Sequence, residues 1–217
     1  MSQVLTTLAA AVPLAAGWSL HTLKLRHRIE AARRDPLTGL CTRDAFEIRA
    51  RKIVGAGACT VVVIDLDGFK QINDTYGHAA GDAVIAATGQ RLKQWSQHHG
   101  GVAGRLGGDE FTAVIRLARA RELRGSMNDL TAALRAPVEF EEHVLWVGAS
   151  LGVIQQRPAN GIADLSQLMR RADEVMYGAK QTGGGWLAAH DTVPEYRTVN
   201  GRRDGRRGTD GGVGATG

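Results

Sequence analysis

The 217-residue sequence contains few cysteines and few aromatic residues. Its two cysteines, Cys41 and Cys59, exclude a disulfide-stapled scaffold, and their spacing fits neither a zinc ribbon nor a redox pair. Aromatic residues make up 5% of the chain, which argues against a stacking platform for single-stranded nucleic acid. Hydrophobic residues at 43% and charged residues at 23% are ordinary globular values, so we expect one folded domain with short appendages.

The formal net charge of +5 belongs to the two ends of the chain. Residues 1–23 have no charged side chain, residues 24–34 have a net charge of +4, and residues 190–217 have a net charge of +1. The middle, residues 35–189, holds 17 basic and 17 acidic side chains. A neutral domain has no basic field to hold a polyanion, so nucleic acid is not an expected partner.

The uncharged N-terminal run predicts a membrane helix. Residues 4–23 match the roughly 20 residues that a spanning helix needs, although threonine, serine, proline and glycine dilute their apolarity. No positive charge precedes the run, so a cleaved signal peptide fits worse. The basic cluster that follows predicts a cytoplasmic location for the rest of the chain. The alternative is a soluble hydrophobic helix that packs on a partner.

These compositional changes divide the chain into four parts. We expect a membrane helix over residues 1–23 and a basic helical linker over residues 24–34. A folded domain should occupy residues 35–189. The glycine- and arginine-rich residues 190–217 have no apolar period and are expected to form a disordered tail.

Within the domain, the hydrophobic periodicity alternates between strands and helices. It predicts strands at 60–64, 102–106, 111–117 and 144–154 and helices at 81–95, 119–135 and 164–181. Residues 60–64 are an unbroken β-branched run, typical of a strand buried on both faces. The order β-α-β-β-α-β predicts a ferredoxin-like sheet with its helices on one face.

Acidic residues follow the first strand and occupy the turn between the next two. If that strand and the hairpin are neighbours, four carboxylates meet at one sheet edge: Asp65, Asp67, Asp109 and Glu110. Oxygen ligands of this kind suit Mg²⁺ or Mn²⁺, which indicates metal-assisted phosphoryl or nucleotidyl transfer. The preceding Gly107 and Gly108 allow the backbone to approach a phosphate or sugar. Taken singly, each acid is more often an ordinary turn residue.

Residues 69–82 form a second group of polar side chains. Lys70 has the charge to meet a phosphate, and Asn73 with Asp82 offers the amide and carboxylate that can read a guanine edge. Two plainer alternatives stay open. His78 alone is more often a structural histidine, and Asp82 is more often a cap of the following helix.

Residues 105–111, RLGGDEF, contain the signature of the GGDEF domain, and residues 35–189 resemble that diguanylate cyclase family. Further marks of the family stand in order: DPLTGL at 35–40, DLDGFK at 65–70, Asn73-Asp74, Gly77-His78, Ser150, Gly152, Ala172-Asp173, Met176-Tyr177 and Ala179-Lys180. The resemblance implies an α+β palm of the nucleotide cyclase and polymerase type. In such a palm, a central, mostly antiparallel sheet is flanked by helices.

The resemblance also implies an activity, in which two GTP molecules condense into cyclic di-GMP with release of pyrophosphate. It implies that Asp65, Asp109 and the Leu66 carbonyl hold Mg²⁺ or Mn²⁺. Asp109, helped by Glu110, would accept the proton of the 3′-hydroxyl. The remaining implied substrate contacts are Asn73 and Asp82 for guanine, His78, Gly107 and Gly108, and Phe69, Lys70 and Lys180 for the triphosphate.

Because the product has two-fold symmetry and each domain has room for one GTP, the active form should be an isologous homodimer. Residues 4–34 are the natural dimerising segment. The implied setting is a bacterial inner membrane with the catalytic domain in the cytoplasm.

One departure from the family pattern concerns phosphate binding. The family carries an arginine where this chain has Gly184, so a contact with the terminal phosphates is missing. This predicts weaker GTP binding or slower turnover, and an arginine restored at position 184 should raise the rate. It also leaves an alternative function, a weak or inactive GGDEF domain that responds to GTP or cyclic di-GMP.

Overall fold

The computed structural model describes residues 18–26, 28–117, 120–156 and 164–189. The predicted tail, residues 190–217, and most of the predicted membrane span lie outside these ranges. Among the helices of the described ranges, none is both long and apolar enough to cross a membrane. The domain boundaries at residues 35 and 189 stay predictions.

The domain is built on a five-stranded sheet with the order β2-β3-β1-β6-β7. The central strand β1 pairs antiparallel with β3 and β6, β2 pairs antiparallel with β3, and β7 runs parallel to β6. The first four strands have the predicted ferredoxin-like order, and β7 extends the sheet by one strand. The bounds are β1 Cys59–Asp67, β2 Val102–Gly107, β3 Glu110–Ile115, β6 Gly148–Gln156 and β7 Gly185–Ala189.

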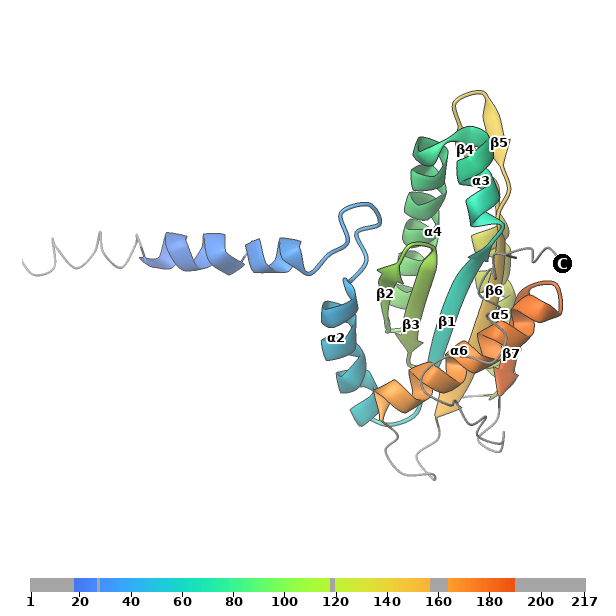
Figure 1. Cartoon of the computed structure of the whole chain (residues 1–217). Coiled ribbons are helices and arrows are strands. Elements are labelled where there is room, and N and C mark those ends of the chain that lie inside the picture. Colours follow the sequence, from blue (N-terminus) through green and yellow to red (C-terminus); the bar gives the residue numbers. More distant parts are fainter. Residues whose placement is uncertain (1–17, 27, 118–119, 157–163, 190–217) are drawn as a thin grey trace, which may run out of the picture.

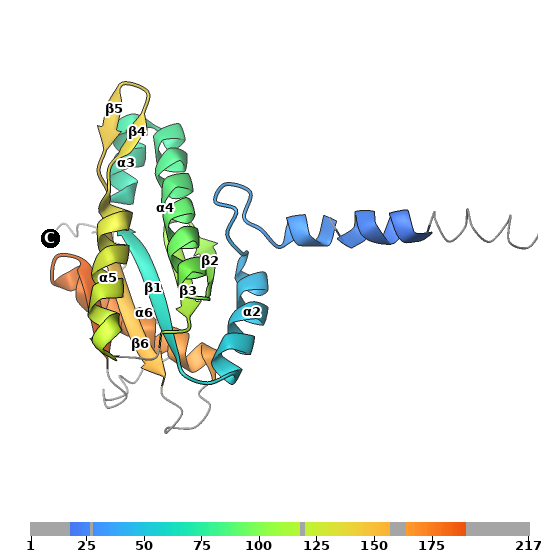
Figure 2. The same cartoon turned by 180° about the vertical axis from the view of Figure 1, so that it is seen from behind.

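Helices cover both faces of this sheet, so the prediction that they lie on one face is wrong. Helices α4 (His78–His98) and α5 (Ala120–Arg135) cover the face seen in Figure 2. Helices α2 (Arg43–Gly55) and α6 (Leu165–Gln181) cover the face seen in Figure 1.

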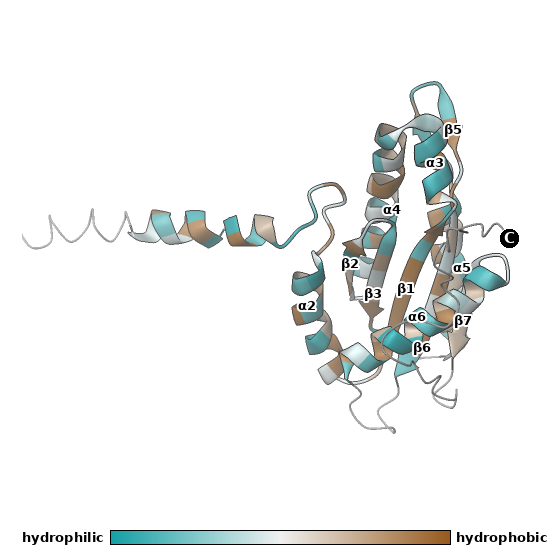
Figure 3. Cartoon of the chain, viewed as in Figure 1, coloured by the Kyte–Doolittle hydropathy of each residue, from teal (hydrophilic) through white to brown (hydrophobic). Residues whose placement is uncertain are grey.

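Successive side chains of β1 point to opposite faces of the sheet, and this explains why both faces are covered. Its residues Val62 and Ile64 belong to one buried cluster, and Val61 and Val63 belong to the other. The apolar character along β1 is visible in Figure 3. A strand that is apolar on both sides needs cover on both sides, as the prediction of a doubly buried strand requires.

Several segments differ from their predicted structure. The strand predicted at 144–154 is divided: β5 (His143–Leu145) pairs with β4 (Val138–Phe140) in a separate hairpin, and β6 enters the main sheet. Helices α2 and α3 (Phe69–Tyr76) and strand β7 were not predicted. The predicted stop after α6 is confirmed, because that helix ends at Gln181.

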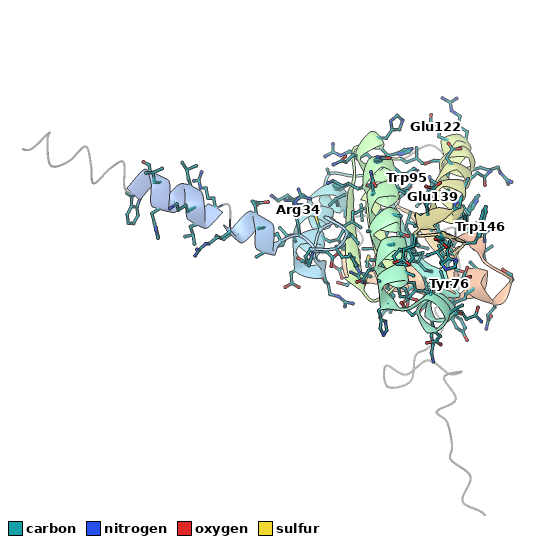
Figure 4. All side chains as sticks on the ribbon, turned by 90° about the horizontal axis from the view of Figure 1, so that it is seen from above. Arg34, Tyr76, Trp95, Glu122, Glu139 and Trp146 are labelled. Carbon is teal, nitrogen blue, oxygen red and sulfur yellow. The ribbon has the colours of Figure 1, made fainter. Side chains whose placement is uncertain are left out.

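The helix predicted at 81–95 lies inside α4, which begins at His78. Asp82 therefore lies within the helix and does not cap it, so that alternative is wrong. At the N-terminus, residues 18–26 and 28–32 are helical and lead away from the domain (Figure 1). Figure 4 shows Arg34 where this segment meets the domain.

Candidate active site

The end of β1 and the β2–β3 hairpin are neighbours, as predicted. Asp65 lies opposite Glu110 in the register of β1 and β3. The Leu66 amide donates a hydrogen bond to the Asp109 carbonyl over 3.3 Å. Gly108 has a φ of 50°, a left-handed conformation that glycine adopts without strain. The hairpin turn therefore holds Asp109 beside the end of β1.

Arg105 fixes this turn to the start of the domain. Its Nε and Nη2 donate to the Gly108 carbonyl at 3.0 and 2.8 Å. Its Nη1 lies 3.3 Å from Asp35 Oδ2. Asp35 Oδ1 also accepts hydrogen bonds from the Thr38 amide and hydroxyl at 2.8 and 2.6 Å. The Asp35 loop and the signature turn are thus one hydrogen-bonded unit.

Lys180 of α6 contacts the cluster of carboxylates at the end of β1. Its Nζ lies 2.5 Å from Asp65 Oδ1, whose side chain is 14% exposed. Partial burial opposes the charge of the lysine, but the hydrogen bond to Asp65 and the charges of Asp65, Asp67 and Asp109 raise its pKa. Partial burial also raises the pKa of Asp109, and the charge of Asp65 adds to this, while Lys180 and Arg105 oppose it.

The donor set fits a divalent cation. Asp65 and Asp109 are two hard oxygen donors whose charges repel, and the Lys180 ammonium now partly neutralises them. Within the described ranges, no group of three or more histidine, cysteine, aspartate or glutamate side chains forms a metal site. An ion held by Asp65, Asp109 and the Leu66 carbonyl would therefore need oxygens from the substrate to complete its coordination.

Asp67 has a separate environment on the same strand. Its Oδ1 accepts a hydrogen bond from Ser150 Oγ at 2.7 Å. Gly148, opposite Asp67 in the β1–β6 register, has no space for a side chain, because its Cβ would stand 2.9 Å from Asp67 Cβ. Sequence reasoning missed Gly148 because only the strand register reveals its opposition to Asp67.

The second predicted group lies where α3 meets α4. A Cβ on Gly81 would overlap the Asn73 side-chain amide, so this amide lies directly over Gly81, the residue that precedes Asp82. Phe69, the first residue of α3, packs against the apolar core. Lys70, His78 and Asp82 are exposed. The predicted residues thus lie in two clusters. One holds the carboxylates at the end of β1, and the other holds the Asn73 amide where α3 meets α4.

Gly184 follows α6 in the loop before β7. The expectation that an arginine here would raise the rate stays a prediction, and the local geometry argues against it. Gly184 has a φ of 87°, and its Cβ would stand 2.8 Å from Asp67 Oδ2 and 2.9 Å from Arg135 Nη2. A side chain at this position would be strained and would displace two others.

A split βαβ sheet with paired carboxylates at its central strand and a glycine-rich signature turn defines a nucleotide cyclase-like palm domain. The family model for "Diguanylate cyclase, GGDEF domain" matches residues 32–185. The chain belongs to the GGDEF domain family.

Two curated relatives illustrate the match. The 19.3 kDa protein in the repSA 5′ region of Streptomyces ambofaciens is 44% identical over 177 residues, which cover 80% of this chain and 92% of that protein. The diguanylate cyclase VdcA of Vibrio cholerae is 34% identical over 157 residues. That match covers 69% of this chain and 44% of VdcA, so the chain spans less than half of that enzyme.

Two crystal structures share the fold. The coiled coil and GGDEF domain of DgcB from Caulobacter crescentus, in complex with c-di-GMP, aligns with a TM-score of 0.74 and 23% identity over 83% of this chain and 98% of that one. A sensory box/GGDEF family protein from Caulobacter crescentus aligns with a TM-score of 0.62 and 37% identity. That alignment covers 70% of this chain and 99% of that one.

Proposed function

We propose that this protein is a diguanylate cyclase, which condenses two GTP molecules into cyclic di-GMP and pyrophosphate. The observation that supports it is the hairpin that holds Asp109 beside Asp65 and the Lys180 ammonium at the end of β1. The family membership of residues 32–185 agrees with this chemistry.

The carboxylates have separate roles in the proposed reaction. Asp65, Asp109 and the Leu66 carbonyl would hold Mg²⁺ or Mn²⁺, whose charge, when bound, offsets the negative charge that develops at the α-phosphate. Asp109, assisted by the exposed Glu110, accepts the proton of the 3′-hydroxyl. The raised pKa of Asp109 brings this carboxylate closer to the basicity that a general base needs near neutral pH.

The groups at α3–α4 would bind the nucleotide. Asn73 and Asp82 pair with the guanine edge, and His78 adds a further contact. Phe69 and Lys70 at the start of α3 meet the triphosphate together with Lys180, while Gly107 and Gly108 let the turn approach the substrate. The position of the half-buried Asn73 amide over Gly81, the residue that precedes Asp82, supports this assignment.

The two-fold product requires two domains face to face, and GGDEF domains act as dimers. The helical residues before the domain carry a stripe suited to pairing. Trp18, Thr22, Leu25, Ile29 and Ala32 follow one another at alternating intervals of four and three, which is the spacing of a coiled-coil seam. The apolar members of this stripe are 43–72% exposed, so they are open to a second copy.

The test is an assay of the full chain with GTP and Mg²⁺ or Mn²⁺. We expect cyclic di-GMP from the wild-type protein and from Asp129→Asn, a control at an exposed position of α5. We expect a loss of at least 100-fold in turnover for Asp109→Asn, with unchanged thermal unfolding. GTP binding without any cyclic di-GMP would instead favour the alternative function of a GTP-responsive regulatory module.

We also propose that the N-terminal residues 4–23 anchor the protein in a membrane. The length of this segment and the basic residues 24–34 support this proposal. The protein should then sediment with bacterial membranes and resist extraction by high salt. Recovery of the full chain in the soluble fraction after lysis at low salt contradicts this.

A further inference from the structure

Arg135 is the last residue of α5 and lies near the carboxylate site, although α5 covers the opposite face of the sheet from α6. Its Nη2 donates a hydrogen bond to the Ala149 carbonyl at 3.4 Å, at the beginning of β6. The guanidinium therefore reaches the end of the sheet where β1 ends and where β6 and β7 begin.

The loop between α6 and β7 meets Arg135 at Gly184. The point where a Cβ of Gly184 would stand is 2.9 Å from Arg135 Nη2 and 2.8 Å from Asp67 Oδ2. The same guanidinium nitrogen is 3.9 Å from the corresponding point on Gly185. Because neither Gly184 nor Gly185 has a side chain, the Arg135 guanidinium and the Asp67 carboxylate both approach this point of the loop.

Two cations from two different helices thus flank the end of β1. Lys180 contacts Asp65, one helical turn before Gly184. Within the described part of the chain, no acidic side chain forms an ion pair with Arg135, whose side chain is exposed. Most of its five N–H donors are therefore available to an anion, whereas the Lys180 ammonium is already engaged.

A purely structural role accounts poorly for this placement. The end of α5 is already held by Arg91, whose two guanidinium nitrogens donate to the Ala136 and Pro137 carbonyls at 2.7 Å each. The 3.4 Å bond from Arg135 to Ala149 is long by comparison and contributes little.

We infer that Arg135 binds the terminal phosphates of GTP and supplies the guanidinium for which position 184 has no room. This inference rests on the proposed function. A planar guanidinium binds phosphate oxygens in a bidentate manner, and a triphosphate placed among Asp65, Asp67 and Asp109 needs cations in addition to Lys180. An arginine from α5 thus takes part in triphosphate recognition from the far side of the α6–β7 loop.

The experiment compares nucleotide binding by the full chain and three variants. Arg135→Ala removes the side chain, and Arg135→Gln keeps a polar side chain but removes the charge. Arg124→Ala is the control, because Arg124 is another exposed arginine of α5. The Kd values for GTP and GMP are measured by calorimetry, and the steady-state KM and kcat are measured for GTP.

We expect the Kd and KM for GTP to rise about tenfold in both Arg135 variants, with kcat changed less. The Kd for GMP should stay unchanged, because GMP lacks the terminal phosphates. A role limited to holding the loop would shift GMP and GTP alike and lower the unfolding temperature. The unfolding temperature of each variant is measured alongside, so that weaker GTP binding at an unchanged unfolding temperature is not a folding defect.

Two failures can be told apart. If the wild-type chain makes cyclic di-GMP and both Arg135 variants bind GTP like Arg124→Ala, the Arg135 inference is overturned and the proposed function stands. If the wild-type chain neither binds nor converts GTP, the proposed function is overturned and the Arg135 inference falls with it.

Discussion

Gly81 lies in α4 directly beneath the Asn73 amide, and the absence of its side chain determines where that amide stands. Asn73 is near the end of α3, and its side chain can rotate away if the space is filled. The absence of a side chain at Gly81 therefore sets the position of the Asn73 amide. A substitution at Gly81 can thus change nucleotide recognition without lowering the stability of the helix.

We predict that Gly81→Ala leaves stability unchanged or raises it by up to about 1 kcal/mol, because alanine is the better helix former. The same substitution should raise the KM for GTP roughly tenfold by displacing Asn73. Gly125→Ala on α5, with no atom within 4 Å of the new Cβ, is the matched control and should alter stability only. Steady-state kinetics and urea unfolding measure both effects, and an unchanged KM for Gly81→Ala would remove Asn73 from the site.

A second prediction at this scale concerns Asp35 and pH. Partial burial alone would raise the pKa of Asp35, but hydrogen bonds from Thr38 and the charge of Arg105 lower it below its ordinary value of 3.8. A depressed pKa means that the ionised form stabilises the fold above pH 3.8, and this stabilisation is lost as the pH falls through the folded-state pKa.

Asp35→Asn should therefore cost about 1 kcal/mol of unfolding free energy at pH 7. The difference from wild type should be smaller at pH 3 than at pH 7, because the stabilisation is lost as the pH falls. Urea unfolding at the two pH values measures it, with the exposed Asp129→Asn as a control that stays near zero throughout. A difference that is the same at both pH values contradicts the role of the Asp35 charge.

At the scale of elements, one side chain of α4 holds the C-terminal end of α5. Arg91 of α4 donates to both the Ala136 and the Pro137 carbonyl, which follow the last turn of α5. These carbonyls have no helical partner, so a planar fork from the neighbouring helix satisfies both. The placement of Arg135, the preceding residue, depends on this end of α5.

Arg91→Lys keeps the positive charge but replaces the planar guanidinium, which donates from two nitrogens, with a single ammonium. We predict a loss of about 1–2 kcal/mol in unfolding free energy, because one carbonyl loses its hydrogen bond. Gln90→Ala, an exposed neighbour on α4, should change stability little. Equal unfolding midpoints for Arg91→Lys and wild type would show that solvent replaces the lost bond.

At the scale of the whole molecule, dimerisation decides whether the proposed chemistry can occur. We predict that Leu25→Asp with Ile29→Asp, both in the exposed stripe, weakens the dimer and lowers activity at least tenfold at micromolar concentration. Ala31→Asp, at an exposed helical position outside the stripe and outside residues 4–23, is the control. Light scattering and cyclic di-GMP synthesis are measured together in one buffer, and a fully active dimeric variant would place the interface elsewhere.

The sequence alone was enough for the order of four of the five strands and for the family. The β-branched residues 60–64 can only form a strand that is buried on both faces, and the marks around RLGGDEF are ordered along the chain. Segments with weak periodicity escaped prediction. The eight-residue α3 is shorter than the window of about 11–18 residues in which a helical repeat is recognised, and strand β7 has mostly partly exposed residues.

The tertiary structure decided which side chains share the site and which helices cover it. Residue types and spacing pointed to Asp65 and Asp109, and the family resemblance implied Lys180, because these predictions depend on local motifs. The clash over Gly184, the amide over Gly81 and the approach of Arg135 depend on contacts between elements far apart in the chain. Such contacts are set by packing across the sheet, which no local pattern of residues encodes.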